Sequence, residues 1–212
     1  MKGLITKELI MFIKQYKLQF SISVLLIPFA ILSKNIPMLF FPPFLLSMLP
    51  ISGLAFDEVS HWDKYTYTLP VDKKDIVSSK YISIVILAVI GVVFSVIGNI
   101  GIMLSDSGYT SETLCISIIA ALLIALTMPS ILFPFYMKFG TAKGRIASSI
   151  FIALVCGSFA TVFSVETDSI FIKIMDKFSN MTMITVVAAL VIIAVFIVSW
   201  LLSIALYKKH EA

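Results

Sequence analysis

The segment YISIVILAVIGVVFSVIGNIGIML, residues 81–104, decides the fold because it contains no charged side chain. A helix rises about 1.5 Å per residue, so about 20 apolar residues cross the hydrocarbon core of a bilayer. Residues 81–104 are long enough and predict a membrane-spanning helix. Further apolar runs predict five more spans, at 18–33, 37–56, 113–137, 146–165 and 181–206. We therefore expect an all-α integral membrane protein with six transmembrane helices.

The overall composition agrees with this fold class. The 212 residues are 59% hydrophobic and 13% charged, with a mean hydropathy of +1.05. Soluble domains carry about 25% charged residues, so a chain this apolar needs lipid around most of its surface. Six spans use about 120 residues, which leaves short loops and no room for a second folded domain. We expect a single transmembrane domain over residues 1–212, surrounded by the lipid bilayer and without a nucleic-acid partner.

Residues 1–17 predict an amphipathic helix that lies at the membrane surface and leads into the first span. Lys7, Lys14 and Lys17 lie largely off its apolar stripe. The residues that recur at helical spacing in this stripe are Ile5, Leu9, Phe12, Ile13 and Tyr16. The same pattern also fits the start of one long first helix.

Turn residues and prolines indicate where the helices stop. A tight turn is expected at 33–35, after the first span. Pro42, Pro43 and Pro50 remove backbone hydrogen bonds from the second span, which we expect to be kinked or broken. Polar loops are expected at 57–80, 105–112, 138–145 and 166–180. The apolar residues within 166–180 also fit a re-entrant element at the membrane surface.

The basic residues predict the orientation. With six spans, thirteen of the sixteen Lys and Arg side chains fall on the same side as the N-terminus. Basic residues concentrate in cytoplasmic loops. We therefore expect a multi-pass protein with both termini and the 57–80 loop in the cytoplasm.

Residues that are missing argue against several classes of protein. No Asp, Glu, Lys, Arg or His lies near the middle of a predicted span. Ion-coupled transporters and intramembrane proteases place such groups there. The segment GTAKGR at 140–145 lacks the spacing of a phosphate-binding loop. Cys115 and Cys156 lie in apolar runs, where buried thiols are expected rather than metal ligands. We expect no catalytic residue, metal site or cofactor on this chain.

Small side chains recur at every fourth position in two predicted spans. One stripe is Gly91, Ser95 and Asn99, and the other is Ser149, Ala153, Gly157 and Thr161. Such stripes let two helix backbones approach closely in lipid. The second stripe predicts either a subunit interface or packing against another helix of the same chain.

The 57–80 loop combines acidic and aromatic side chains. Asp57, Glu58 and Asp63 accompany Trp62, Tyr65 and Tyr67, and Asp72 suits a helix N-cap before the third span. This content fits docking onto a soluble partner. It also fits a belt at headgroup level, where aromatic rings lie at the interface and charges stay in water.

The run FDEVSHWDKYTYTLPVDKKDIVSSKY resembles the first cytoplasmic loop of small type-2 ABC exporter permeases. The positions that match this pattern are Asp57, Glu58, Trp62, Asp63, Lys64, Leu69, Pro70, Val71, Ile76, Val77, Lys80 and Tyr81. The six-span layout with a surface N-terminal helix is similar over the whole chain. The branch with tiny outer loops includes bacterial permeases for phenol-soluble modulins and antimicrobial peptides.

The resemblance implies a permease subunit that has no ATP-binding domain of its own. A separate ABC ATP-binding subunit would bind ATP and Mg²⁺, and a second permease copy or a paralogue would complete the dimer. A short coupling helix would lie near 59–67. The residues implied in coupling are Asp57, Glu58, Val59, Trp62, Asp63, Tyr65, Leu69, Pro70, Val71 and Lys80.

The resemblance also implies export of hydrophobic or amphipathic cargo such as peptides across a bacterial cell membrane. We expect replacing Asp57 and Glu58 by Ala to leave the protein inserted and to weaken partner-stimulated ATP turnover. The alternative is a non-transporting immunity or assembly module that binds a cytoplasmic partner through the same loop.

Overall fold

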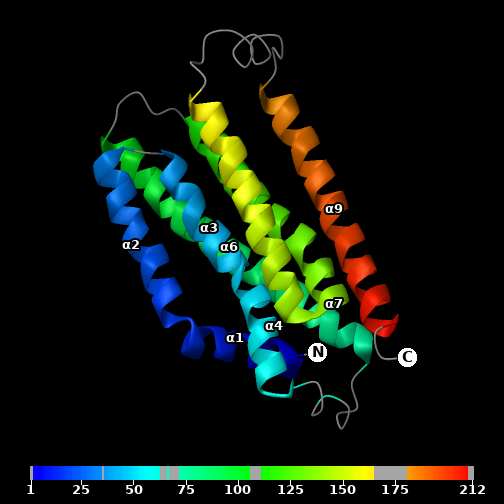
Figure 1. The fold of residues 1–212 in the computed structure, drawn as a ribbon. Helices are drawn as coiled ribbons and strands as arrows, with labels where there is room; N and C mark the ends of the chain where they lie inside the picture. Colours follow the sequence, from blue (N-terminus) through cyan, green and yellow to red (C-terminus); the bar gives the residue numbers. More distant parts are fainter. Residues whose placement is uncertain are drawn as a thin grey trace.

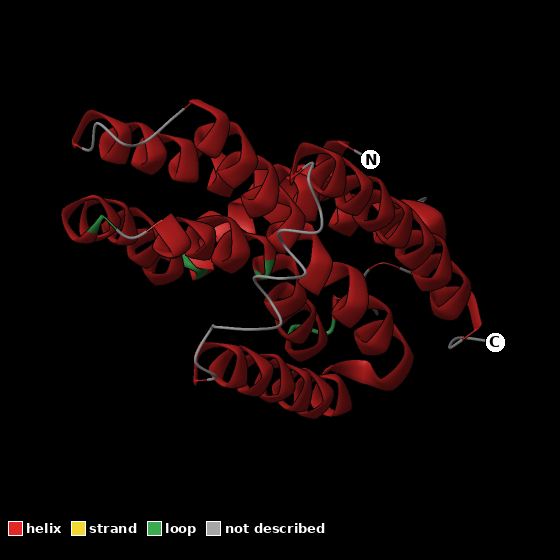
Figure 2. Ribbon diagram, turned by 90° about the horizontal axis from the view of Figure 1, so that it is seen from above, coloured by secondary structure: helices red, strands yellow, loops and turns green. Residues whose placement is uncertain are grey.

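The computed structural model describes residues 2–34, 36–62, 66, 72–105, 111–164 and 181–209. These residues are helical nearly throughout and contain no strand, which confirms the all-α class for this part of the chain (Figures 1 and 2). The elements are α1 (Lys2–Gln15), α2 (Lys17–Ser33), η1 (Ile36–Phe40), α3 (Phe41–Ser47), α4 (Leu49–Val59), α6 (Lys73–Ser105), α7 (Ser111–Ser164) and α9 (Met181–Lys209).

Four helical segments of the described chain are long and apolar enough to cross a membrane. They are Ile36–Val59, Lys74–Ser105, Leu114–Ile146 and Val187–Tyr207. The bent pair formed by α1 and α2 is a fifth if it counts as one span. The predicted span at 146–165 is helical as far as Ser164, but most of its side chains lie outside the described residues. The total of six spans therefore stays a prediction.

The N-terminal region is a short helix followed by a steep bend. The axes of α1 and α2 differ by 73° across Tyr16, so the chain does not begin with one long straight helix. At the other end of α2, Lys34 adopts a left-handed conformation with φ of 51°. Its N–H bonds to carbonyls of the last helical turn, which confirms the turn expected there.

The second predicted span is broken, as its prolines predicted. Pro42 and Pro43 lie in the first turn of α3, and Pro50 lies in the first turn of α4. Proline is tolerated at these positions because the first N–H groups of a helix have no partner within it. The break at Met48 therefore follows directly from the proline spacing.

The stripe of small residues on α6 packs within the chain. Gly91 lies against the backbone of Pro43, and a Cβ atom at Gly91 would overlap it. Ser95 and Asn99 are fully buried, and Ser117 of α7 donates a 2.9 Å hydrogen bond to the Asn99 side-chain oxygen. The stripe thus brings α3 and α7 close to α6, and packing within the chain explains it.

Helix α7 is a hairpin rather than two helices joined by a loop. The helix breaks at Gly140, whose φ of 75° and ψ of 172° favour glycine. The second half returns beside the first (Figure 1), and the Tyr136 hydroxyl lies 3.0 Å from the Ser148 hydroxyl. The loop predicted at 138–145 contains this turn but is too long, because the residues on both sides of Gly140 are helical. The expected burial of Cys115 is wrong, since this thiol is exposed.

Helix α9 forms a hydrogen bond to a backbone carbonyl of α7 that has no partner within α7, because a proline stands four residues later. Pro134 has no N–H, so the Ser130 carbonyl lacks its usual partner in the helix. The Ser199 hydroxyl donates a 2.5 Å hydrogen bond to that carbonyl. The Tyr81 hydroxyl of α6 lies 2.7 Å from Ser199 Oγ and 2.8 Å from Ser203 Oγ. These contacts join three helices at one depth.

The Ser199→Ala substitution is expected to destabilise the protein by about 0.6–1.7 kcal/mol, since it leaves the Ser130 carbonyl without its donor. The thermal unfolding midpoint of the detergent-solubilised protein measures this effect. In a Pro134→Ala background the helix supplies its own donor, so the same substitution should have a smaller effect. An equal effect of Ser199→Ala in both backgrounds would contradict this assignment.

Candidate functional site

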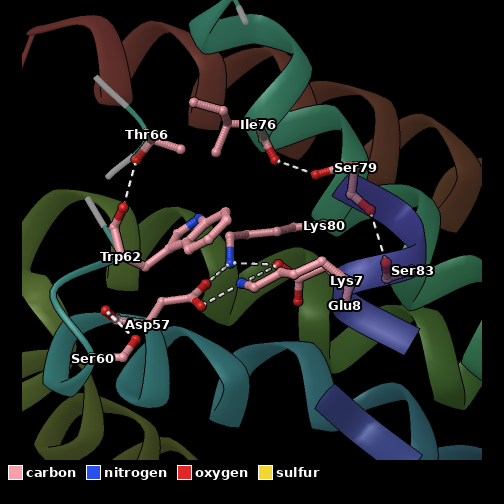
Figure 3. A network of polar contacts seen from close by, with 10 residues as sticks. All are labelled: Lys7, Glu8, Asp57, Ser60, Trp62, Thr66, Ile76, Ser79, Lys80 and Ser83. Atoms are coloured by element: carbon pink, nitrogen blue, oxygen red, sulfur yellow. Dashed lines mark hydrogen bonds and ion pairs between the residues drawn. The ribbon is translucent and has the colours of Figure 1, made fainter. Parts of the chain in front are cut away.

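Three helices bring four charged side chains together at the end of the bundle where α4 stops and α6 starts (Figure 3). Lys7 Nζ lies 2.5 Å from Asp57 Oδ1 and 3.2 Å from Glu8 Oε1. Lys80 Nζ lies 3.2 Å from Glu8 Oε1 and also bonds to Asp57 Oδ2. Because α1, α4 and α6 each contribute to it, we call these four side chains the charge network.

Three members of the charge network are almost completely buried. Glu8 is 3% exposed, and Asp57 and Lys80 are each 4% exposed. A buried charge is strongly unfavourable unless an opposite charge and hydrogen bonds compensate it. Two ammonium groups and two carboxylates provide that compensation. Glu8 Oε2 is nevertheless buried without a hydrogen-bond donor among the described residues.

The helical spacing of α1 explains why Glu8 is buried. Glu8 lies three residues after Ile5 and four before Phe12, so it is on the face of α1 that packs against the bundle. Burial, with the nearby Asp57 and Glu8 carboxylates, raises the pKa of the Tyr16 hydroxyl at the end of α1.

The charge network continues into the segment that follows α4. Lys7 Nζ lies 4.3 Å from the centre of the Trp62 ring, which is a cation–π contact. Thr66 donates a 2.9 Å hydrogen bond to the Trp62 carbonyl, and both residues have helical backbone (Figure 3). A displacement of Trp62 would therefore act directly on α1 through Lys7.

A second contact joins the end of α4 to the turn of the α7 hairpin. Glu58 Oε2 accepts hydrogen bonds from the Thr141 hydroxyl and from the Thr141 N–H, the latter at 3.3 Å. Thr141 begins the second helix of the hairpin, directly after Gly140. A carboxylate at this place satisfies an N–H without a partner and complements the helix dipole. Glu58 therefore caps a helix 83 residues further along the chain.

A cavity of about 250 Å³ lies between these two contacts. Asp57, Glu58 and Lys80 line it together with the aromatic side chains of Trp62 and Tyr136. Its walls come from α4, α6, α7 and α9. Charged and aromatic groups in one cavity suit a side chain with an apolar stem and a polar end.

Comparison with known protein families decides what kind of protein has this arrangement. A family model described as ABC-2 family transporter protein matches residues 3–208. The chain belongs to the ABC-2 family of transporter proteins. No curated protein and no solved structure matches it. Membrane subunits of the ABC-2 family generally pair with an ATP-binding subunit and are generally not catalytic themselves. The chain is thus a membrane-spanning component of an ABC transporter.

The end of α4 in this ABC-2 protein presents exposed side chains beside the charge network. Val59 is 80% exposed, and Glu58 is also at the surface. Asp57 and Lys80, two of the residues implied in coupling, are buried and bonded to each other. The other residues implied in coupling lie outside the described residues and are Asp63, Tyr65, Leu69, Pro70 and Val71.

Sequence reasoning missed Lys7 and Glu8 as members of this ABC-2 site. The available signal was an acidic residue on the apolar stripe of an amphipathic helix. A carboxylate on this apolar stripe is stable only beside a cation, because burying an unpaired carboxylate is strongly unfavourable.

The predicted subunit-packing stripe lies on the second half of the α7 hairpin in this ABC-2 protein. Ser149 and Ala153 are exposed, and the neighbouring Ile146 and Ile150 are 64% and 58% exposed. The Gly157 and Thr161 side chains lie outside the described set. This face is therefore open to lipid or to another subunit.

Replacing Glu58 by Ala is expected to destabilise the protein by about 0.5–2 kcal/mol, the usual effect of losing a helix N-cap. The thermal unfolding midpoint in detergent measures this change. Glu58→Gln keeps an acceptor oxygen for Thr141 and should lose less. If the Ala variant unfolds at the wild-type temperature, Glu58 does not hold the α7 hairpin turn.

Proposed function

We propose that the chain is the permease subunit of an ATP-driven exporter and that it works with a separate ATP-binding subunit. The observation that carries this proposal is the charge network, which ties α1, α4 and α6 together beside the segment that follows α4. An ATP-binding subunit that pushes on this segment would move three helices as one body. Membership of the ABC-2 family supports such a partner.

The contacts of Trp62 supply the first step of this transmission. Its ring contacts Lys7, and Lys7 bonds to Asp57, so a displacement of the segment reaches α1 and α4. Lys80 then carries the displacement into α6, which continues to Ser105 at the opposite end of the bundle. Glu58 carries it into the α7 hairpin.

The surface and the spans favour hydrophobic or amphipathic cargo such as peptides. Large apolar side chains are exposed along α2, α6 and α9, where lipid or lipid-borne cargo has access. The predicted spans carry no Asp, Glu, Lys, Arg or His near their middle, so no charged group there selects a charged solute. A second permease copy or a paralogue would meet the exposed face of α7. The bias of basic residues favours an orientation with the network end in the cytoplasm, and we propose that the membrane is that of a bacterial cell.

Purification of the tagged chain from its host in mild detergent tests this function. We expect an ATP-binding subunit to co-purify in stoichiometric amount and to hydrolyse ATP. Val59→Glu places a charge at the exposed end of α4 and should reduce both its recovery and its ATP turnover. Lys34→Glu, at the far end of α2, is the matched control and should change neither.

Two results would count against the exporter. Absence of an ATP-binding subunit in several mild detergents would favour the immunity or assembly module. Unchanged recovery and turnover in Val59→Glu would remove the docking site from the segment after α4.

A further inference from the structure

At the network end of the bundle, the exposed basic side chains of α1, α2 and α7 outnumber the exposed carboxylates of the described residues, which are Glu58 and Asp72. Glu8 and Asp57 are buried in the charge network, and Glu58 is bonded to Thr141. Five basic side chains on α1, α2 and α7 are exposed and form no ion pair with any other described residue. They are Lys14, Lys17, Lys138, Lys143 and Arg145. These elements therefore present uncompensated positive charge.

One of these cations shares a helix face with exposed apolar side chains, and another follows it. Ile13 and Lys14 lie three and four residues after Ile10, so these side chains share one face of α1, and Lys17 follows at the start of α2. Ile10 is 48% exposed and Ile13 is 65% exposed, whereas Phe12 on the opposite face is 3% exposed. Because the axes of α1 and α2 differ by 73°, α1 runs across the direction of α2. Such a helix lies along a membrane surface rather than through it.

The turn of the α7 hairpin repeats the same combination. Phe135 and Phe139 are stacked with ring centres 6.2 Å apart, and both are nearly half exposed. Lys138 Nζ lies 5.1 Å from the centre of the Phe139 ring. After Gly140, Arg145 is followed by Ile146, which is 64% exposed. Basic groups and apolar groups again alternate on one exposed surface.

We propose that the exposed faces of α1 and of the α7 turn bind the anionic headgroups of phospholipids. The ammonium and guanidinium groups would contact lipid phosphates while the Ile and Phe side chains enter the acyl region. An acidic protein surface would match the charges but would leave these apolar side chains without a suitable surrounding. The lipid surface matches both, and the exposed apolar faces of the neighbouring helices are continuous with it.

Fluorescence quenching in vesicles tests this proposal without any ATP-binding subunit. A bimane label is attached at Gln15→Cys or at Ala142→Cys, both exposed positions, in a background of Cys115→Ser and Cys156→Ser. The vesicles mix phosphatidylcholine and phosphatidylglycerol, with bromine on one lipid at a time. Each label should be quenched more strongly by brominated phosphatidylglycerol at equal mole fraction. This preference should decrease as salt is raised, because exposed charges are screened.

Removing the basic groups should remove the preference. Lys14→Gln with Lys17→Gln should lower it at position 15, by about fivefold for each charge removed. Lys138→Gln with Lys143→Gln and Arg145→Gln should lower it at position 142. Lys34→Gln, an exposed lysine at the opposite end, should change neither. Equal quenching by both lipids in the unsubstituted background would overturn the proposal and would favour an acidic protein surface.

Discussion

The Asp57→Ala substitution is expected to destabilise the protein by about 3–5 kcal/mol, because it leaves Lys80 buried without its closest counter-ion. Lys80 keeps only Glu8, whose remaining oxygen already lacks a donor among the described residues. Lys7 loses its shorter ion pair at the same time. The thermal unfolding midpoint of the detergent-solubilised protein measures the effect. Partner-stimulated ATP turnover should also decrease, since the ion pair between α4 and α6 is lost.

A second substitution distinguishes the effect of the buried charge on stability from the effect of the lost contact on ATP turnover. Lys80→Met in the Asp57→Ala background removes the uncompensated ammonium group and should restore much of the stability. It should not restore turnover, because the link between α4 and α6 stays broken. Glu58→Ala, at the adjacent exposed carboxylate, is the control for loss of an acidic side chain. If Asp57→Ala were no more destabilising than Glu58→Ala, the charge network would not hold these helices together.

Replacing Gly91 by Val is expected to destabilise the protein by about 3 kcal/mol, at the upper end of the usual effect of overpacking. A Cβ atom at Gly91 would overlap Pro43 Cα and lie 2.8 Å from the Pro43 nitrogen. Both are backbone atoms, so they cannot rotate away as a side chain would. Helix α6 would have to separate from α3. The same unfolding measurement detects this loss.

The matched control for Gly91 is Gly3 in α1, which is also helical. No heavy atom lies within 4 Å of a Cβ placed at Gly3. Gly3→Ala should therefore stabilise the protein slightly, by up to about 1 kcal/mol, through its higher helix propensity. A neutral or stabilising Gly91→Val would mean that α3 and α6 are not in close contact.

Features that depend on neighbouring residues could be predicted from the sequence. Three prolines within nine residues predicted the break between α3 and α4, since each proline removes a defined hydrogen bond. The turn at Lys34 was predicted in the same way. The α7 turn lies within the loop predicted at 138–145, but that loop was predicted too long because the end of an apolar run was taken as the end of a helix. Ala, Lys and Arg are good helix formers, so the chain is helical on both sides of Gly140.

Contacts between distant residues could not be predicted. Glu8 and Lys80 are 72 residues apart, and no local pattern indicates that they meet. The resemblance of the 57–80 loop identified Asp57 and Lys80 as important without showing that they bond to each other. It also could not show that Glu58, one residue further along, bonds to a different helix. Two adjacent carboxylates thus have different roles, which only their spatial neighbours define.

The charge network also gives the order in which the chain can mature during synthesis. Lys7 and Glu8 leave the ribosome first, Asp57 follows, and Lys80 emerges last of the four. Until Lys80 arrives, two carboxylates share one ammonium group, so α1 and α4 cannot settle into their final contact. A chain that ends before α6 keeps an unmatched negative charge at the edge of the lipid. We expect such a fragment to be less stable than the complete bundle, because its buried carboxylates lack a cation.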